Sequence, residues 1–177
     1  MKQKTAVFLD RDGVINHAFV RDGKSYPPQT MGEFTLIAGV IEACEQLKAA
    51  GYLLIIVTNQ PDVSTGKQEE SVVCQMHDHL RKALPIDDIY VCYHVDADGC
   101  ECRKPKPGML VEAAKEYDID LPHSFMVGDR WKDIDAGDAC GCQTFFIDYN
   151  YKEKKPSNKA CRVKNLLEAS DIILDMA

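Results

Sequence analysis

Short apolar runs alternate with amphipathic stretches along most of the chain, and this alternation restricts the fold more than any other feature. Runs that are apolar almost throughout are typical of strands buried on both faces of a parallel sheet. The six expected strands span residues 6–9, 53–58, 89–94, 125–127, 144–147 and 172–174. The expected helices lie near residues 39–50, 69–83, 108–117, 132–139 and 163–169. The pattern predicts an α/β fold, a Rossmann-like parallel sheet with helices on both faces.

Length and charge narrow the class of protein. With 177 residues, a single domain spanning 1–177 is expected. The net charge of −7 argues against a nucleic-acid-binding protein, which usually carries a basic face. The first residues become polar too early for a signal peptide, and no apolar run is long enough to cross a membrane. We therefore expect a cytoplasmic monomer without nucleic-acid or membrane partners.

The expected first strand runs directly into Asp10, Arg11, Asp12 and Gly13. Residues two apart in an extended segment project to one side, so the two carboxylates lie together while Arg11 points away. Two carboxylates this close are costly unless a cation or a shared proton holds them. The pattern predicts a Mg²⁺ site with a nucleophile and an acid/base beside it. The alternative is an aspartate-rich turn that caps a strand.

Polar residues follow three other expected strands, and the carboxyl ends of parallel strands share one edge of the sheet. Thr58, Asn59 and Gln60 offer a hydroxyl, amides and backbone N–H groups that suit a phosphate oxygen. Alternatively, they form a plain polar turn. We assign Asn59 and Gln60 to substrate binding.

The other two segments carry cations and carboxylates. Arg103 and Lys104 precede a proline, and both side chains suit a phosphate, although Lys106 competes with Lys104 for the inner position. Asp129 leaves the fourth expected strand, and Asp133 lies where the next helix begins. A site built from two or three carboxylates suits Mg²⁺. The alternative is a turn residue followed by a helix N-terminal charge.

In this order, the four segments resemble those of the haloacid dehalogenase superfamily of phosphohydrolases. The resemblance implies that Asp10 is the nucleophile and Asp12 the general acid/base, acting through an aspartyl-phosphate intermediate. It places Thr58 on the transferring phosphoryl group and Lys104 as the lysine that stabilises it. It also implies that Asp129 completes the Mg²⁺ site with Asp10 and Asp12.

The intervals between these segments are mostly filled by their own helices and strands, which leaves no room for a separate cap domain. We expect an open site, shielded only by a flap formed by the polar segment 16–34 and by the cysteine-containing segment 92–102. By the same resemblance, Asp133 is an auxiliary metal ligand or supports the ligands.

Four of the possible soft ligands lie close together in the segment 92–102. Cys92, His94, Cys100 and Cys102 form two pairs, each spaced by two, so both members of a pair point the same way. Four such ligands without an open position predict a structural Zn²⁺ site, and free thiols are the alternative. Zinc would hold the hairpin that delivers the following cations. The remaining cysteines are expected to be small buried side chains: Cys44, Cys74, Cys140, Cys142 and Cys161.

The cysteine segment and the sequence after it, CRKPKPGM, are similar to those of the heptose 1,7-bisphosphate phosphatases and the related histidinol-phosphate phosphatases. FLDRDGVIN, VTNQ and MVGD match the same group. The resemblance implies that Arg103 and Arg130 bind substrate. It also implies removal of the 7-phosphate from a small phosphorylated sugar, heptose 1,7-bisphosphate, in nucleotide-heptose synthesis. The alternative is the same chemistry on another small phosphomonoester, such as histidinol phosphate.

Overall fold

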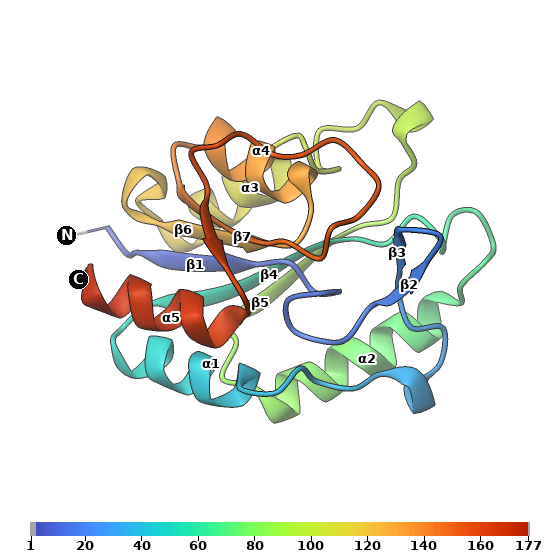
Figure 1. Cartoon of the computed structure of the whole chain (residues 1–177), viewed down its shortest axis with the longest axis horizontal. Coiled ribbons are helices and arrows are strands. Elements are labelled where there is room, and N and C mark those ends of the chain that lie inside the picture. The colour runs from blue at the N-terminus through green and yellow to red at the C-terminus, as the bar shows by residue number, and fades with distance from the viewer. Residues whose placement is uncertain (1–2, 177) are drawn as a thin grey trace.

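The structure is a computed structural model that describes residues 3–176. Its main sheet has six parallel strands in the order β5-β4-β1-β6-β7-β8 (Figure 1). These strands are β1 (Ala6–Leu9), β4 (Leu53–Asn59), β5 (Asp88–Cys92), β6 (Phe125–Gly128), β7 (Gln143–Ile147) and β8 (Cys161–Val163). The helices are α1 (Val40–Ala49), α2 (Glu70–Ala83), α3 (Gly108–Tyr117), α4 (Trp131–Ala139) and α5 (Leu166–Asp175). The chain also forms three short 3-10 turns: η1 (Met31–Glu33), η2 (Asp96–Asp98) and η3 (Leu121–His123).

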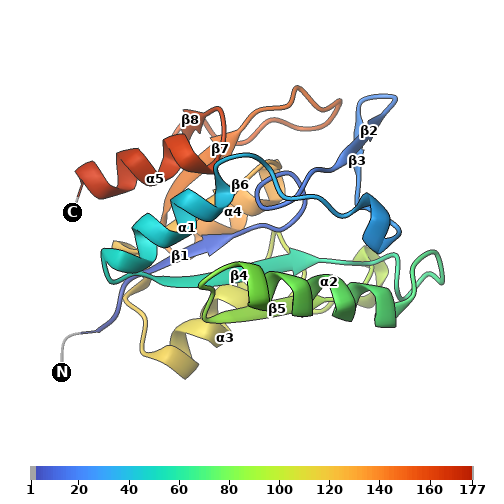
Figure 2. The same cartoon turned by 90° about the horizontal axis from the view of Figure 1, so that it is seen from below.

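The sheet is covered on both faces, as the sequence predicts. Helices α1, α2 and α5 lie on one face and α3 and α4 on the other (Figures 1 and 2). The central strand β1 alternates between the two hydrophobic cores: Val7 and Leu9 face the first group, and Ala6 and Phe8 the second. All four side chains are fully buried. Burial on both faces explains why the strand is apolar throughout.

The sixth strand was predicted at the wrong place. Residues 172–174 are not a strand but lie in α5, and the strand at the sheet edge is β8. The side chain of Asn165 accepts a hydrogen bond of 2.9 Å from the Glu168 backbone N–H, which begins the helix after the predicted start at 163. Three apolar residues in a row imitate a strand, but only Ile173 is fully buried. Strand β8 gave no apolar signal because only Val163 of its three residues is buried.

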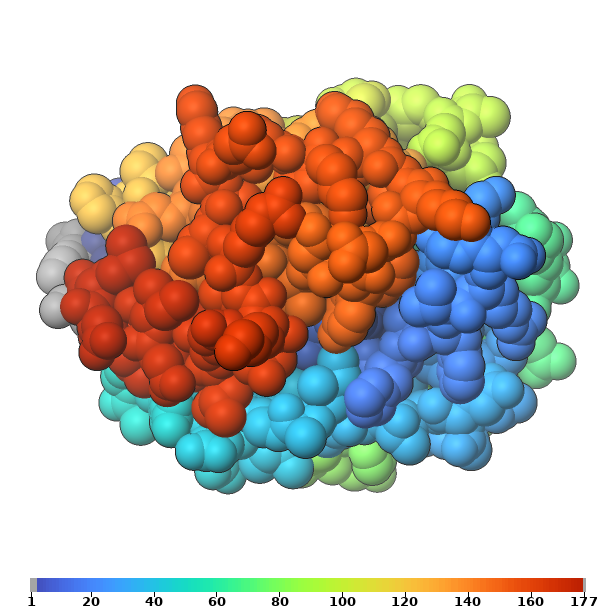
Figure 3. All heavy atoms as spheres, in the orientation of Figure 1, coloured from blue at the N-terminus to red at the C-terminus, as the bar shows by residue number. Residues whose placement is uncertain are grey.

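Segment 16–34 contains a hairpin that the sequence did not predict, formed by β2 (Phe19–Arg21) and β3 (Lys24–Tyr26). Asp22 and Gly23 connect the strands with φ of 52° and 79°, as a two-residue hairpin turn requires. The hairpin lies at the carboxyl-terminal end of the sheet (Figures 1 and 2). The Lys152 backbone N–H donates to the Gly23 carbonyl oxygen at 2.8 Å, so the loop after β7 packs beside the hairpin (Figure 3).

Two further observations concern the surface and the cysteines. Between residues 3 and 176, no helix is long and apolar enough to cross a membrane. Of the five cysteines expected to be buried, Cys44 and Cys142 are buried, Cys140 is half-buried, and Cys74 and Cys161 are exposed. The expectation failed for Cys161 because its strand lies at the sheet edge.

The cap of α5 gives a first prediction. Asn165→Ala removes the hydrogen bond to the Glu168 N–H and should lower the free energy of unfolding by about 1 kcal/mol, measured by urea denaturation. The control is Asn158→Ala in an exposed loop, which should change it by less than about 0.5 kcal/mol. Equal losses in both variants would contradict this role for the cap.

Candidate active site

The loop after β1 begins beside the end of β6, the neighbouring strand in the sheet. The Asp10 backbone N–H donates to the Val127 carbonyl oxygen at 3.0 Å, which carries the chain alongside β6. Gly13 follows with a φ of +88°, and a Cβ there would lie 2.1 Å from Asp129 Oδ2. Only glycine fits this approach, so the glycine of the Asp-x-Asp-Gly pattern lets the loop pack against Asp129.

Three carboxylates meet at this edge of the sheet. Asp10, Asp129 and Asp133 each present an oxygen within 4.8 Å of the others, and all three residues are buried. Asp129 directly follows β6, and Asp133 lies in the first turn of α4. A Cβ on Gly128 would lie 2.1 Å from the Asp133 Cβ, so the glycine allows α4 to begin against the strand end.

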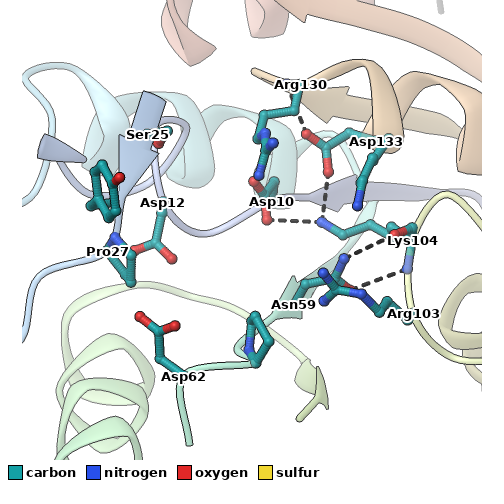
Figure 4. Close-up of a pocket in the computed structure, with 13 residues that line it drawn as sticks. Asp10, Asp12, Ser25, Pro27, Asn59, Asp62, Arg103, Lys104, Arg130 and Asp133 are labelled. Carbon is teal, nitrogen blue, oxygen red and sulfur yellow. Dashed lines mark hydrogen bonds and ion pairs between the residues drawn. The ribbon is translucent and has the colours of Figure 1, made fainter. Parts of the chain in front are cut away.

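Lys104 lies among these carboxylates and is almost completely buried. Its Nζ donates to Asp10 Oδ1 at 2.8 Å and to Asp133 Oδ1 at 2.7 Å (Figure 4). It also donates to the Val57 carbonyl oxygen at 2.7 Å. Lys106, the competing candidate in the sequence, instead pairs with Glu101 at the surface. The structure therefore brings Lys104 and not Lys106 to the carboxylates.

Three carboxylates surround a single cation, and the pKa values of Asp10 and Asp129 reflect this imbalance. Burial, with the nearby Asp133, raises the pKa of Asp10 to about 6 although Lys104 opposes the shift. Burial and both neighbouring carboxylates raise the pKa of Asp129 well above its usual range. Burial disfavours the charged form of Lys104, but Asp10 and Asp133 more than offset it and raise its pKa. The site therefore disfavours ionisation of all its carboxylates while Lys104 is the only cation of the described residues that lies among them.

One oxygen of the cluster is unsatisfied within the protein. Asp129 Oδ1 is buried and has no hydrogen-bond partner among the described residues. Buried polar atoms are rarely left in this state. An unpaired oxygen among three carboxylates suits a hard divalent cation, for which carboxylate oxygens are the preferred ligands. The residues present therefore fit Mg²⁺.

The carboxylate of Asp12 does not join this group. It points to the hairpin side of Asp10 (Figure 4) and accepts hydrogen bonds from Asn16 at 2.9 Å and from Gln60 at 2.8 Å. The prediction that the Arg11 side chain points away from both aspartates is wrong for Asp12. Its guanidinium is fully buried and returns to Asp12, where Nη2 donates to Oδ1 at 3.0 Å and to Oδ2 at 3.1 Å.

The three polar residues that follow Val57 take different positions. Thr58 is buried, and its hydroxyl accepts from Gln60 Nε2 at 2.9 Å, so the Gln60 amide bridges Thr58 and Asp12. Asn59 pairs with the backbone of Lys104 in both directions, at 3.0 and 3.1 Å. This pair joins the end of β4 to the segment that carries the buried lysine.

A cavity of about 210 Å³ opens beside Asp10. One wall is cationic and contains Arg103, Arg130 and Lys132. The opposite wall comes from the hairpin and from the loop after β4, with Ser25, Tyr26, Pro27, Pro61 and Asp62 (Figure 4). Segment 16–34 thus shields the site from one side, and Asn59 lines the cavity whereas Thr58 and Gln60 do not.

Carboxylates hold the cationic wall in place. Asp96 lies in the loop between His94 and Cys100. Its Oδ1 accepts a hydrogen bond from Arg103 Nε at 2.6 Å and lies 3.6 Å from Lys132 Nζ. Glu153 accepts from Arg130 Nε at 3.0 Å. Arg103 Nη1 is buried without a hydrogen-bond partner among the described residues, so a donor remains free for a ligand.

The four predicted zinc ligands converge at the end of β5 and in the loop that follows it. Cys92, His94, Cys100 and Cys102 present ligand atoms that all lie within 4.8 Å of one another. Individual separations include 3.7 Å between Cys92 and Cys100 Sγ and 3.4 Å between His94 Nδ1 and Cys102 Sγ. Tetrahedral zinc with bonds of about 2.0–2.3 Å places its ligands roughly 3.5–3.8 Å apart. Four of the ligand separations, at 3.4–3.7 Å, are close to this range, and the Cys92 and Cys102 Sγ atoms are closer, at 2.9 Å.

Two tyrosines of the loop after β7 contact the site, and sequence reasoning missed both. Tyr151 is buried and its hydroxyl donates to Asp129 Oδ2 at 2.8 Å. The Tyr149 hydroxyl donates to the Gly13 carbonyl oxygen at 2.9 Å. The only signal was a pair of aromatic residues in a lysine-rich loop, which by itself indicates no partner.

Comparison with known proteins identifies the family to which the chain belongs. The model of the haloacid dehalogenase-like hydrolases matches residues 17–141. The chain is 42% identical over 147 residues to a D-glycero-beta-D-manno-heptose-1,7-bisphosphate 7-phosphatase of Pasteurella multocida, covering 76% of each chain. It is 39% identical over 173 residues to a D-glycero-alpha-D-manno-heptose-1,7-bisphosphate 7-phosphatase of Campylobacter jejuni, covering 95% of this chain and 94% of the relative.

A solved structure agrees over the whole fold. A D,D-heptose 1,7-bisphosphate phosphatase from B. bronchiseptica, complexed with magnesium and phosphate, superposes with a TM-score of 0.84 at 27% identity. The match covers 98% of this chain and 99% of the other. These findings confirm the family resemblance and the fold inferred from the sequence: the chain belongs to the haloacid dehalogenase-like hydrolases.

Proposed function

We propose that this hydrolase is a Mg²⁺-dependent phosphatase that removes the 7-phosphate from D-glycero-D-manno-heptose 1,7-bisphosphate in nucleotide-heptose synthesis. The observation that carries the proposal is the buried Lys104 between Asp10 and Asp133, next to a cavity with a cationic far wall. One end of that cavity suits phosphoryl transfer, and the other suits a second phosphate. The similar heptose bisphosphate phosphatases support this substrate.

In the proposed reaction, the Asp10 carboxylate attacks phosphorus as the bond to the sugar oxygen breaks, which forms an aspartyl-phosphate. Asp12 donates a proton to the departing sugar oxygen. Asp12 then accepts a proton from water, whose oxygen attacks phosphorus and releases phosphate from Asp10. Lys104 and Thr58 stabilise the transferring group. Mg²⁺ held by Asp10, Asp129 and Asp133, next to Asp12, would offset the repulsion between the carboxylate and the anionic substrate.

The second phosphate of the substrate would bind the cationic wall. Arg103 and Arg130 present planar guanidinium groups that match phosphate oxygens, and Lys132 adds a positive charge. The buried Nη1 of Arg103 is free to donate. Asn59 would contact substrate in the cavity, and Gln60 would act through Asp12 and Thr58. The hairpin wall would contact the sugar and read the anomer.

We also propose that Cys92, His94, Cys100 and Cys102 hold a structural Zn²⁺. Their spacing supports a closed tetrahedral site, and Arg103 and Lys104 follow the last ligand directly. Zinc would therefore fix the loop that delivers both cations. Such thiolates persist in the reducing cytoplasm, which is the compartment that we propose for this protein. We also propose that the protein is a monomer with a single domain.

The substrate proposal is tested by phosphate release, with Mg²⁺, from both anomers of heptose 1,7-bisphosphate and from histidinol phosphate. Turnover of one heptose anomer should exceed that of histidinol phosphate, and Asp10→Asn should lower it more than about 1,000-fold. Lys104→Met should lower it about 100-fold or more because it removes the buried charge, whereas Lys106→Met should leave it unchanged. Poor, equal turnover of all three substrates would exclude the heptose assignment.

Mg²⁺ binding should depend on pH because protons and metal compete for the carboxylates. The pKa of Asp10 is raised from 3.8 to about 6 in the fold, so its protonated form stabilises the metal-free protein at low pH. That contribution is lost as the pH rises from about 4 through about 6. Calorimetric titration should show the apparent Mg²⁺ affinity falling about tenfold per pH unit below pH 6. Constant affinity between pH 5 and 7.5 would be inconsistent with this site.

The zinc site is tested by metal analysis and thermal melting. The purified chain should contain one zinc, and Cys102→Ser should lose it and melt at a lower temperature, because structural zinc contributes to folding. Cys161→Ser changes an exposed cysteine outside the cluster and should keep both properties. A wild-type protein that contains no zinc and melts at the same temperature as Cys102→Ser would refute the proposal.

A further inference from the structure

Asp12 is surrounded by hydrogen-bond donors from three residues, two in its own loop and one after β4. Arg11 donates to both of its oxygens, Asn16 donates to Oδ1 at 2.9 Å, and Gln60 donates to Oδ2 at 2.8 Å. Arg11 contributes most, because Nε also donates to Oδ1 at 3.2 Å. Three of these five hydrogen bonds come from one guanidinium, so its orientation has the largest influence on that of the Asp12 carboxylate.

That guanidinium is itself held from its other side by a histidine of α2. Arg11 Nη1 lies 3.1 Å from His77 Nε2, and both residues are buried. The Phe34 ring covers the guanidinium, with the centroid 5.7 Å from Cζ. Two edges of the planar group are thus occupied, one by His77 and one by Asp12. A plane fixed at two edges and covered on one face cannot rotate freely.

The contact requires one form of the imidazole. Arginine has only donors, so His77 Nε2 must accept and the ring must be neutral with its proton on Nδ1. Burial and the adjacent Arg11 lower the pKa of His77 to about 4, which agrees with this form at neutral pH. The histidine serves as an uncharged acceptor that does not compete with Asp12 for the charge of Arg11.

We propose that His77 is a positioning residue that fixes the Arg11 guanidinium and thereby orients Asp12 for proton transfer to the leaving oxygen. The inference rests on the proposed role of Asp12 as general acid. It gives a function to a buried histidine that the proposed reaction does not otherwise use. Without His77, Nη1 would be a buried donor without its partner, and the guanidinium would turn away from Asp12 to satisfy it.

Leaving groups of different acidity separate this role from a general structural one. A sugar alkoxide needs a proton as it leaves, whereas p-nitrophenolate leaves without one. His77→Leu should therefore lower kcat/KM for the heptose bisphosphate about tenfold or more, and should change kcat/KM for p-nitrophenyl phosphate less than about twofold. The ratio kcat/KM reports only the steps through formation of the aspartyl-phosphate, so the later role of Asp12 does not confuse the comparison.

Two variants complete the test. His77→Gln keeps an oxygen acceptor for Arg11 and should recover most of the loss on the heptose bisphosphate. Val73→Ala removes a buried side chain one turn earlier in α2 and should lower the melting temperature without changing the ratio between the two substrates.

The outcomes separate the two proposals. A loss on the sugar substrate alone, recovered by His77→Gln, supports the positioning role. Equal losses on both substrates, or no loss on either, would overturn it. Failure of the wild-type chain to hydrolyse either substrate would instead overturn the proposed function.

Discussion

The arrangement of the site depends on one buried ammonium group. Lys104 Nζ is shared by Asp10, Asp133 and the end of β4, which come from three separate parts of the chain. Removing a lysine from water is costly unless partners replace its hydration, and here three oxygen atoms do so. The carboxylates in turn could not lie this close without a cation. Each charge therefore requires the other, and the excess of carboxylates leaves the site ready for a divalent metal.

Around Lys104, a different local contact holds each loop at the carboxyl-terminal edge of the sheet. Asn59 joins β4 to the backbone of Lys104, and Gly13 lets the first loop approach Asp129. Tyr151 brings the loop after β7 to the same carboxylate, and the hairpin contacts that loop through Gly23. The hydrogen bonds of one loop thus constrain the next. A cap domain is not needed for such a site to be partly enclosed, because the hairpin and two loops form the walls of the cavity.

How far the sequence predicted this structure depends on the range of each signal. Five of the six strands were predicted near their observed positions, because strands buried on both faces are apolar throughout. The sixth was wrong because β8 is an edge strand with one buried residue, whereas the end of α5 is a run of apolar residues. The hairpin was missed because its strands are short and exposed, so alternation between buried and exposed residues was absent.

For the site, local spacing was sufficient wherever strand ends or ligand pairs set the geometry. The approach of Asp10 to Asp129, and of the four zinc-type ligands to one another, follows from parallel strands that share an edge and from residues two apart in extended chain. Only the tertiary structure decided between Lys104 and Lys106, turned Arg11 back to Asp12, and brought His77 and Tyr151 to the site. Side-chain direction and contacts between distant loops depend on packing and on the hydrogen bonds available at each point. No local pattern in a sequence records these.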